Sequence, residues 1–363
     1  MARQRVTSHD VAKLAGVSQP TVSRVFAPNS RVSARLHDRV KDAASRLGYR
    51  PNTLARSLTT GRSGVIGIVL AGLSNPFYAD ALEKLSAALQ AQGYRTLVFF
   101  SANHAAEVDG VVEDLIDHQV DGIVLASVSI SNTLTERLKT SDLPFVLFNR
   151  GQIDASIPSI TAQNTLGGRI AAHALAACGH RRIAHFSGWQ QSLNGQERQA
   201  GFLQGLADLG LQPHSLTDCA YRPQQAAEAA RHVFGPTAAE RAPDAVFVGN
   251  DNMAFAVLDV LRYELGIDVP GDVSVIGFDD VPAAASPAYA LTTVRQPTNR
   301  MVAATVSTLC AMIDGTQPLH THIEIESTLI QRGSARLPKG WTVPLFAPLA
   351  PDLPSQERAK IDA

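Results

Sequence analysis

Residues 7–26 read TSHDVAKLAGVSQPTVSRVF, and this stretch predicts two short helices joined by a tight turn. Thr7 or Ser8 can cap the first helix, because a side-chain oxygen there accepts a bond from a backbone N–H that has no partner within the helix. Gly16 provides the backbone freedom that a sharp turn between helices requires. Ser18 is a natural N-cap for the second helix. The stretch is therefore typical of a helix-turn-helix.

The second helix of this pair has one apolar and one polar face. The residues that we expect to pack the two helices together are Val11, Leu14, Ala15, Val17, Val22 and Val25. The polar face does not pack against a hydrophobic core, and a helix-turn-helix places such a face in the major groove of DNA. Arg24 can bond guanine there, and Gln19 can bond adenine. The other candidate DNA-binding residues of the pair are Thr7, Ser18, Pro20, Thr21 and Ser23. A small helical hairpin with a solvated polar face is the alternative interpretation.

The charge of the chain is segregated by position. Residues 1–62 hold 12 lysines and arginines but 3 aspartates and glutamates, a net charge of +9. The whole chain has a net charge of −1, so the remaining residues carry −10. A basic segment on an acidic body is the electrostatic pattern of a nucleic-acid-binding head. A merely solvated charged surface does not explain why the sign changes with position.

Length and composition limit the class of protein. A chain of 363 residues is too long for one ordinary core, so we expect two or three domains. No apolar run reaches membrane-spanning length, and the first residues lack the apolar stretch of a secretory signal. Cys178, Cys219 and Cys310 lie far apart and have no metal-ligand spacing. We expect a cytoplasmic protein without a membrane association, a metal or a cofactor.

A third helix, capped by Ser33, completes a small domain over residues 1–50. Residues 51–63 then predict a short helix capped by Asn52 and a linker. A helix of this length is marginal in isolation, so we expect it to form only when it is docked on DNA. Leu58 is an apolar residue in an exposed connector, which suits a wedge that inserts into the minor groove.

From Gly64 onward strands alternate with helices, which predicts doubly wound parallel sheets. The expected strands are 65–70, 96–100, 122–126, 144–148, 182–186, 245–248, 273–277 and a strand region over 320–329. The expected helices are 76–91, 105–118, 134–139, 164–178, 197–209, 223–234, 250–264 and 301–313. The pattern restarts near residue 164, so residues 64–336 predict two lobes in series. Such lobes bind a ligand between the carboxyl ends of their strands and close by a hinge.

The fold class is therefore an all-α three-helix helix-turn-helix head and an α/β body of two doubly wound parallel-sheet lobes. Residues 337–363 form a separate tail that has five prolines between residues 337 and 354 and a polar end. We expect this tail to be flexible or loosely packed. It has no leucine heptad, so it gives no sign of a tetramer-forming coiled coil.

Two motifs have a specific combination of residues. The first is Val6-Thr7, Asp10-Val11-Ala12, Ala15-Gly16-Val17-Ser18 and Thr21-Val22-Ser23-Arg24-Val25; the second is Gly48-Tyr49-Arg50-Pro51-Asn52, Ala55-Arg56 and Leu58. Together with the two-lobed body, they resemble the lac repressor (LacI/GalR) family of transcriptional regulators. The resemblance covers residues 5 to about 335.

The resemblance implies a repressor that binds a pseudo-palindromic operator in double-stranded DNA as a homodimer. Helix 18–26 would read one half-site. Residues 51–59 would form a hinge helix in the minor groove, with Asn52, Ala55 and Leu58 at the DNA. A small-molecule effector, a sugar or a sugar derivative, would bind between the lobes of a periplasmic-binding-protein-like body and change the order of the hinge helices. The body would dimerise chiefly through its first lobe.

The resemblance also places the effector site. Carried over by position, its residues are Asn75, Phe77, Asn164, Arg198, Tyr221, Asn250 and Asp279. Hydroxylated ligands require convergent donors and acceptors and an aromatic face, which these residue types supply. Asp251 and Asp280 also follow strands, and we interpret them as structural residues that cap the next helix. Gln163 and Pro20 depart from the family's pattern, which bears on the effector and on the operator sequence.

Two other classes of protein share some of these features. A sugar-binding protein without a DNA role would share the lobes, but it would need a signal peptide and no helix-turn-helix. An enzyme would need a site that the sequence does not show, since no phosphate loop and no G-x-G-x-x-G follows the first strand. Residues 320–326 read HTHIEIE and hold metal-ligand residue types. Their strict alternation is more typical of a solvated strand than of a metal site.

Overall fold

The computed structural model describes residues 6–26, 32–50, 62–101, 105–128, 131–151, 154, 156–235, 242–316, 320–344 and 346. The chain divides at Gly64 into two compact units. The predictions for the hinge segment, including those for Asn52, Ala55 and Leu58, lie outside the described residues. No helix within the described ranges is long and apolar enough to cross a membrane.

The described residues of the first unit form three helices, α1 (Ser8–Ala15), α2 (Gln19–Val25) and α3 (Ala34–Leu47). Thr7 caps α1 in a capping box: its hydroxyl oxygen accepts the Asp10 N–H, and the Asp10 carboxylate accepts the Thr7 N–H at 2.8 Å. These bonds to Thr7 lower the pKa of Asp10. Gly16 follows α1 with φ +61°, a left-handed conformation that glycine adopts without strain. The predicted turn between two short helices is thus present.

The core of this unit differs from the sequence prediction at one residue. The buried side chains are Val11, Ala12, Ala15, Val22, Val25, Val40, Ala43 and Ala44. Leu14, predicted to be in the core, is 44% exposed, and Ala12 occupies the core face of α1 instead. Close packing of three short helices requires a small side chain there. Ser18 and Ser33 occupy the N-cap positions of α2 and α3, but neither side chain bonds to the helix backbone.

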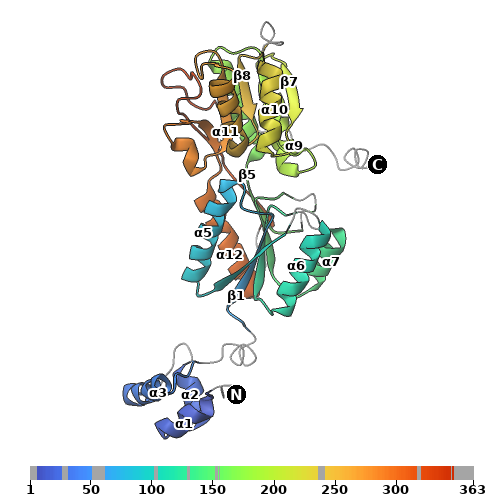
Figure 1. Ribbon diagram of the computed structural model, residues 1–363. Coiled ribbons are helices and arrows are strands. Elements are labelled where there is room, and N and C mark those ends of the chain that lie inside the picture. The colour runs from blue at the N-terminus through green and yellow to red at the C-terminus, as the bar shows by residue number, and fades with distance from the viewer. Residues whose placement is uncertain are drawn as a thin grey trace. The chain divides into compact units, whose positions relative to one another are not determined.

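The first lobe of the body is a parallel sheet covered by helices on both faces (Figure 1). Its strands, in spatial order, are β11 (His322–Ile325), β5 (Ser159–Ala162), β4 (Phe145–Phe148), β3 (Gly122–Ala126), β1 (Val65–Leu70) and β2 (Arg95–Phe100). One face packs against α5 (Pro76–Ala91) and α12 (Thr298–Ile313), and the other against α6 (Ala105–Asp117) and α7 (Asn132–Thr140). Both faces are buried, so the central strands are continuous apolar runs.

The second lobe repeats this arrangement. Its strands, in spatial order, are β12 (Thr328–Ile330), β10 (Thr292–Arg295), β9 (Ser274–Asp279), β8 (Ala245–Val248), β6 (Ile183–Ser187) and β7 (Ser215–Asp218). Its helices are α8 (Asn164–Ala177) and α9 (Leu193–Ala207) on one face and α10 (Pro223–Phe234) and α11 (Asp251–Asp259) on the other. α11 continues as a π-helical turn over Val260–Glu264. β12 pairs with β10 in antiparallel orientation, so this sheet is not wholly parallel.

The two lobes are not in series, which corrects the sequence prediction. After β10 the chain returns to the first lobe as α12 and β11, and it then enters the second lobe again as β12. With the connection from β5 to α8, three segments cross between the lobes. An amphipathic helix or a short strand carries no local signal of the sheet on which it packs, so the sequence order suggested two separate halves.

Helices α8 and α9 approach each other closely because glycines line their contact. A Cβ atom on Gly201 would lie 1.9 Å from the backbone oxygen of Thr165, and one on Gly168 would lie 2.1 Å from the backbone oxygen of Arg198. Neither obstacle is a flexible side chain. This crossing brings the N-terminus of α8 beside Glu197 and Arg198 of α9.

We expect Gly201→Ala to destabilise the body by about 3 kcal/mol, since overpacking at a rigid contact forces the backbone apart. Gly110→Ala is the matched control, because Gly110 is also helical but has no atom within 4 Å of its ideal Cβ position. The control should gain about 0.5–1 kcal/mol through a lower entropy of the unfolded chain. Urea unfolding of both variants checks this, and equal shifts would contradict the role of the α8–α9 contact.

Two aromatic residues of the C-terminal tail, which the sequence predicts to be flexible or loosely packed, contact the second lobe. Trp341 packs against the core cluster beneath α8 and α9. The Phe346 ring lies 4.9 Å from the His173 ring and 4.5 Å from the Arg169 guanidinium, both on α8. Aromatic side chains bury much apolar area, so Trp341 and Phe346 are the residues of the tail that contribute apolar contacts with the second lobe.

Candidate functional site

The polar face of α2 is exposed, as its composition predicts. Gln19, Pro20, Ser23 and Arg24 are exposed, whereas Val22 and Val25 point into the core. Pro20 stands in the first turn of α2, where its missing N–H costs no helical bond. The face thus presents an amide and a guanidinium from one helix, the groups that can read base edges in a major groove.

The remaining candidates around α2 have local partners. The Ser18 hydroxyl lies 2.9 Å from the Thr21 hydroxyl, and the Gln19 amide donates to the Ser8 hydroxyl at 3.1 Å. Thr7 is engaged in the capping box of α1. Thr7 therefore has a structural role that the sequence analysis also allowed.

A second candidate site is a cleft of about 800 Å³ between the lobes of the body. Five of the seven predicted effector residues line it: Asn75, Arg198, Tyr221, Asn250 and Asp279. They come from α5 and the first lobe on one side and from α9, β9 and the loops of the second lobe on the other. The topology thus brings together side chains that are up to about 200 positions apart in the sequence.

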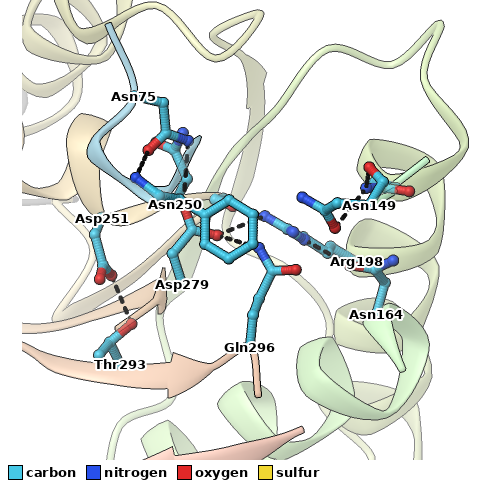
Figure 2. Close-up of polar contacts among 12 residues, drawn as sticks. Asn75, Asn149, Asn164, Arg198, Asn250, Asp251, Asp279, Thr293 and Gln296 are labelled. Atoms are coloured by element: carbon cyan, nitrogen blue, oxygen red, sulfur yellow. Dashed lines mark hydrogen bonds and ion pairs between the residues drawn. The ribbon is translucent and has the colours of Figure 1, made fainter. Parts of the chain in front are cut away.

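Arg198 is the buried centre of this cleft (Figure 2). Its Nε donates to Asn164 Oδ1 at 2.9 Å, and its Nη1 donates to the backbone oxygen of Gly249 at 2.7 Å. The guanidinium also lies 3.7 Å above the Phe278 ring and 3.6 Å from an Asp279 carboxylate oxygen. A guanidinium fixed by this many contacts presents its remaining donors in a defined direction.

Asp279 accepts bonds from both sides of the cleft. Gln296 Nε2 donates to its Oδ1 at 2.7 Å, and Asn75 Nδ2 of the first lobe donates to its Oδ2 at 3.3 Å. Its backbone has φ 128°, in the left-handed half of the map that residues other than glycine rarely occupy. Burial raises the pKa of Asp279, and the nearby Arg198 cation opposes that rise. Strained backbone at a cleft is a mark of function rather than of stability.

Asn250 has the capping role that the sequence suggested for Asp251, in addition to its predicted place in the cleft. Asn250 is the N-cap of α11, since its Oδ1 accepts the Met253 N–H at 2.9 Å, and it also lines the cleft. Asp251 is no cap: it is fully buried and accepts the Val281 N–H at 3.0 Å. Asp280 accepts bonds from two arginines at 2.6 Å each. Both aspartates are structural, as expected, but through different bonds.

Two predicted effector residues lie behind the cleft surface. Phe77 is buried in the core of the first lobe, where its ring stacks on Phe148 at 6.3 Å. Tyr78, the next residue on α5, lines the cleft in its place. Asn164 is buried and does not line the cleft, but it orients Arg198 through the bond described above. The prediction of Phe77 as a wall of the cleft is therefore wrong by one helical position.

An aromatic ring lines the cleft because glycine makes room for it. A Cβ atom on Gly188 would lie 2.0 Å from the Tyr221 ring, so the ring lies directly over the end of β6. Tyr221 itself has φ 56°. On the opposite lobe, burial raises the pKa of Tyr78 to about 12, and its hydroxyl accepts a bond from Asn149 Nδ2 at 3.1 Å. Both phenols are therefore neutral near neutral pH.

The sequence prediction left out further residues of the cleft, among them Asn149, Arg150, Trp189 and Asn194. Asn149 and Arg150 follow β4, the same position after a strand that pointed to Asn250 and Asp279. Applying that rule to the first lobe would have found them. Trp189 follows β6 in the same way.

The described residues hold no group of three or more histidine, cysteine or acidic side chains placed to bind a metal ion. His322 and Glu324 of the HTHIEIE run are exposed on β11, and Ile325 is buried, as predicted for a solvated strand. The Glu324 carboxylate raises the pKa of His322.

Glu197, which contacts Asn164 where α8 and α9 cross, makes the stability of the body depend on pH. Burial raises its pKa to about 7, and the bond that Asn164 Nδ2 donates to it at 3.0 Å opposes the rise. An acid whose pKa is higher in the folded state stabilises the fold below its unfolded pKa, and this contribution is lost as the pH rises through the folded pKa. The body should therefore lose stability between about pH 4.5 and pH 7 through this group.

We expect Glu197→Gln to remove that loss. One unit of pKa corresponds to about 1.36 kcal/mol, but Glu197 is only half-buried, so we expect roughly 1 kcal/mol of relative stabilisation at pH 8 and none at pH 4.5. Thermal unfolding from pH 4.5 to 8 measures the difference from wild type, with Glu83→Gln on the exposed side of α5 as the control. A difference that does not change with pH would contradict the assignment.

Comparisons with known proteins agree with this geometry. Residues 7–52 match the family profile described as bacterial regulatory proteins, lacI family, and residues 172–335 match the periplasmic binding protein-like domain. The chain is 33% identical over 345 residues to the HTH-type transcriptional regulator CelR of Thermobifida fusca, covering 92% of this chain and 99% of that relative.

Solved structures agree as well. A transcriptional regulator CelR–cellobiose complex matches with a TM-score of 0.68 and 30% identity, over 91% of this chain and 100% of that one. The lac repressor dimer bound to operator and the anti-inducer ONPF matches with a TM-score of 0.83 over 92% of this chain and 100% of that one. At 24% identity, the latter likeness supports the fold.

Proposed function

This chain belongs to the lacI family of bacterial regulatory proteins and is a DNA-binding transcriptional regulator, and from that premise we propose that it is a repressor whose operator binding is controlled by a carbohydrate in the cleft of the body. The observation that carries the proposal is the pairing of two features in one chain. One is an exposed base-reading face on α2, and the other is a cleft between two lobes that both supply polar side chains.

The head supports recognition of a double-stranded operator. Arg24 and Gln19 would contact base edges, and Ser18, Pro20, Thr21 and Ser23 would fit the groove around them. Asn52, Ala55 and Leu58 remain predictions for the minor groove, since they lie outside the described residues. The net charge of +9 over residues 1–62 would attract the phosphate backbone.

The cleft supports a polyhydroxylated ligand. Arg198, Asn250 and Asp279 offer donors and a carboxylate to ring hydroxyls, and Tyr221 offers a face to the C–H side of a sugar. Asn75 bonds to Asp279 across the cleft, and Asn252 bonds to the backbone oxygen of Ser74 at 3.2 Å. A ligand between these groups would alter contacts that join the lobes, which is how a bound molecule changes their closure.

The regulator would act as a cytoplasmic homodimer on a pseudo-palindromic site, because two-fold symmetric proteins match two-fold symmetric DNA. The solved CelR structure that matches this chain is a complex with cellobiose, which favours a sugar or a sugar derivative as the effector here. The domain bounds would be 1–50 for the head, 51–63 for the hinge and linker, and 64–336 for the body.

Selection from a random DNA pool tests the proposal. The full chain should enrich pseudo-palindromic fragments, and gel shifts at several salt concentrations should show binding at least 10³-fold tighter than to random DNA at physiological salt. Affinity for both should fall as salt rises. Enrichment of no common site, or equal affinity for selected and random DNA, would contradict the proposed function.

A further inference from the structure

The cleft of the body is larger than one sugar ring needs. Its volume is about 800 Å³, near the upper end of the range of about 300–1,000 Å³ that pockets for drug-sized molecules have. A single hexose is smaller than such molecules. The lining of the cleft also changes in chemistry from one part to another, so each part can be assigned to the kind of ligand group that it complements.

One part of the lining is a compact polar cluster around Asp279 (Figure 2). The Arg198 guanidinium lies 3.6 Å from the Asp279 carboxylate. Gln296 and Asn75 donate to the same carboxylate, at 2.7 Å and 3.3 Å. Gln296 Oε1 is buried and has no hydrogen-bond partner among the described residues. Donors and acceptors thus lie side by side, which suits the hydroxyl groups of one sugar ring, because each hydroxyl can donate and accept.

A second part of the lining is aromatic and lies at the end of β6. The Tyr221 ring lies directly over Gly188, and Trp189 is the next residue along the chain. The Tyr221 ring centre is 5.9 Å from the Arg198 guanidinium, so this ring borders the polar cluster. The Trp189 ring centre is 5.9 Å from the guanidinium of Arg150, which belongs to the first lobe. The two rings therefore face different parts of the cleft.

The loop that carries Trp189 is held in place by its neighbours. Ser192 donates to the Trp189 backbone oxygen twice, from its N–H at 3.1 Å and from its hydroxyl at 2.7 Å. A Cβ atom on Gly195 would lie 2.3 Å from the same oxygen, so the glycine permits this close approach. The Gln190 side chain donates to the backbone oxygen of Gly188 at 2.9 Å. A half-buried indole on such a loop is a preorganised apolar surface within the cleft.

We propose that the effector is a glycoside with two rings, whose sugar ring binds at the polar cluster and whose second ring, a further sugar or an aryl group, lies against Trp189. The inference rests on the proposed function and adds the chemical class of the ligand. Both kinds of second ring present an apolar face that an indole complements. Tyr221 would contact the ligand near its glycosidic bond, since it borders both parts of the lining. Trp189 would then determine the specificity for the second ring.

Isothermal titration of the full chain with matched glycosides tests this. The glucose series comprises methyl β-glucoside, phenyl β-glucoside and cellobiose, and the galactose series comprises methyl β-galactoside, phenyl β-galactoside and lactose. We expect at least one two-ring member to bind about tenfold or more tightly than the methyl glycoside of its series, because its second ring buries apolar area against the indole. The member that binds distinguishes a second sugar from an aryl group.

Trp189→Leu should lower this preference to about threefold or less and leave the affinity for the methyl glycoside unchanged, since leucine has no flat ring. Trp189→Phe should retain a preference of about fivefold or more, which separates a lost ring face from a disturbed loop. Tyr263→Leu is the matched control and should keep the full preference. Tyr263 is 76% exposed on the π-helical turn after α11 and does not line the cleft.

The proposal is overturned if no two-ring member binds, if the methyl glycosides bind as tightly as their two-ring partners, or if Trp189→Leu keeps the preference. A methyl glycoside that binds as tightly as both partners and changes operator affinity would overturn this inference alone. A two-ring glycoside that shows the expected preference but leaves operator affinity unchanged would overturn the proposed function alone.

Discussion

Replacing Arg198 with methionine is expected to lower the affinity for the effector by roughly 100-fold and to abolish its influence on operator binding. Truncating one partner of a buried, hydrogen-bonded charge pair costs about 2–5 kcal/mol in binding, and each 1.4 kcal/mol is tenfold. Methionine keeps the contact with the Phe278 face but removes the bonds to Asn164 and Gly249. Operator affinity without effector should change less than twofold, because the head is a compact unit separate from the body that holds Arg198.

Two further variants separate a lost contact from a damaged fold. Arg198→Met leaves Asp279 buried without its cation, so the body should lose stability. The double variant Arg198→Met/Asp279→Asn should regain stability and still fail to respond to the effector. Thermal unfolding and titration of both variants measure these outcomes. A single variant that responds to the effector with the wild-type affinity would show that the cleft assignment is wrong.

Replacing Arg24 with alanine is expected to weaken binding to the selected operator by about 1–3 kcal/mol, a loss of roughly 5- to 150-fold. Arg24 is exposed on α2 and belongs to no ion pair among the described residues, so its loss should not unfold the head. Affinity for random DNA should fall far less, because base contacts specify and phosphate contacts position. The ratio of the two affinities is therefore the quantity to measure.

Arg46→Ala is the control for Arg24→Ala. Arg46 is in the last turn of α3 and lies 3.8 Å from Asp42, in a solvent-exposed ion pair. Its removal takes the same charge from the head but no group from the face of α2. Fluorescence anisotropy with operator and random duplexes should give an unchanged ratio for Arg46→Ala. If both variants lower the ratio equally, Arg24 contributes only charge.

The sequence predicted the elements well where periodicity and end signals agree. The helix over 76–91 begins after the Asn75 cap with proline in its first turn, and the structure has those bounds. The strand over 245–248 and the helix over 223–234 also match. The four-residue strands β5, β7 and β10 were missed, because runs this short carry little period-two signal.

The connection of the lobes could not be predicted from local sequence. α12 and β11 have the same texture as any helix and strand of the body, and only their partners reveal that they belong to the first lobe. The error in the connection of the lobes had little effect on the predicted site. The carboxyl ends of parallel strands lie at one edge of the sheet, whatever the order in which the chain visits the strands. This is why Arg198, Asn250 and Asp279 lie on one cleft although the predicted order of the lobes was wrong.

The most direct test measures the coupling between ligand binding in the cleft and operator binding by the head, once from each side. A ligand found by thermal shift is added at saturation, and anisotropy then gives the affinity of the full chain for its selected operator with and without it. We expect operator affinity to change at least fivefold. Linkage requires that saturating operator change the ligand affinity by the same factor. If ligand and operator each bind with the same affinity whether or not the other is present, the cleft does not control the head.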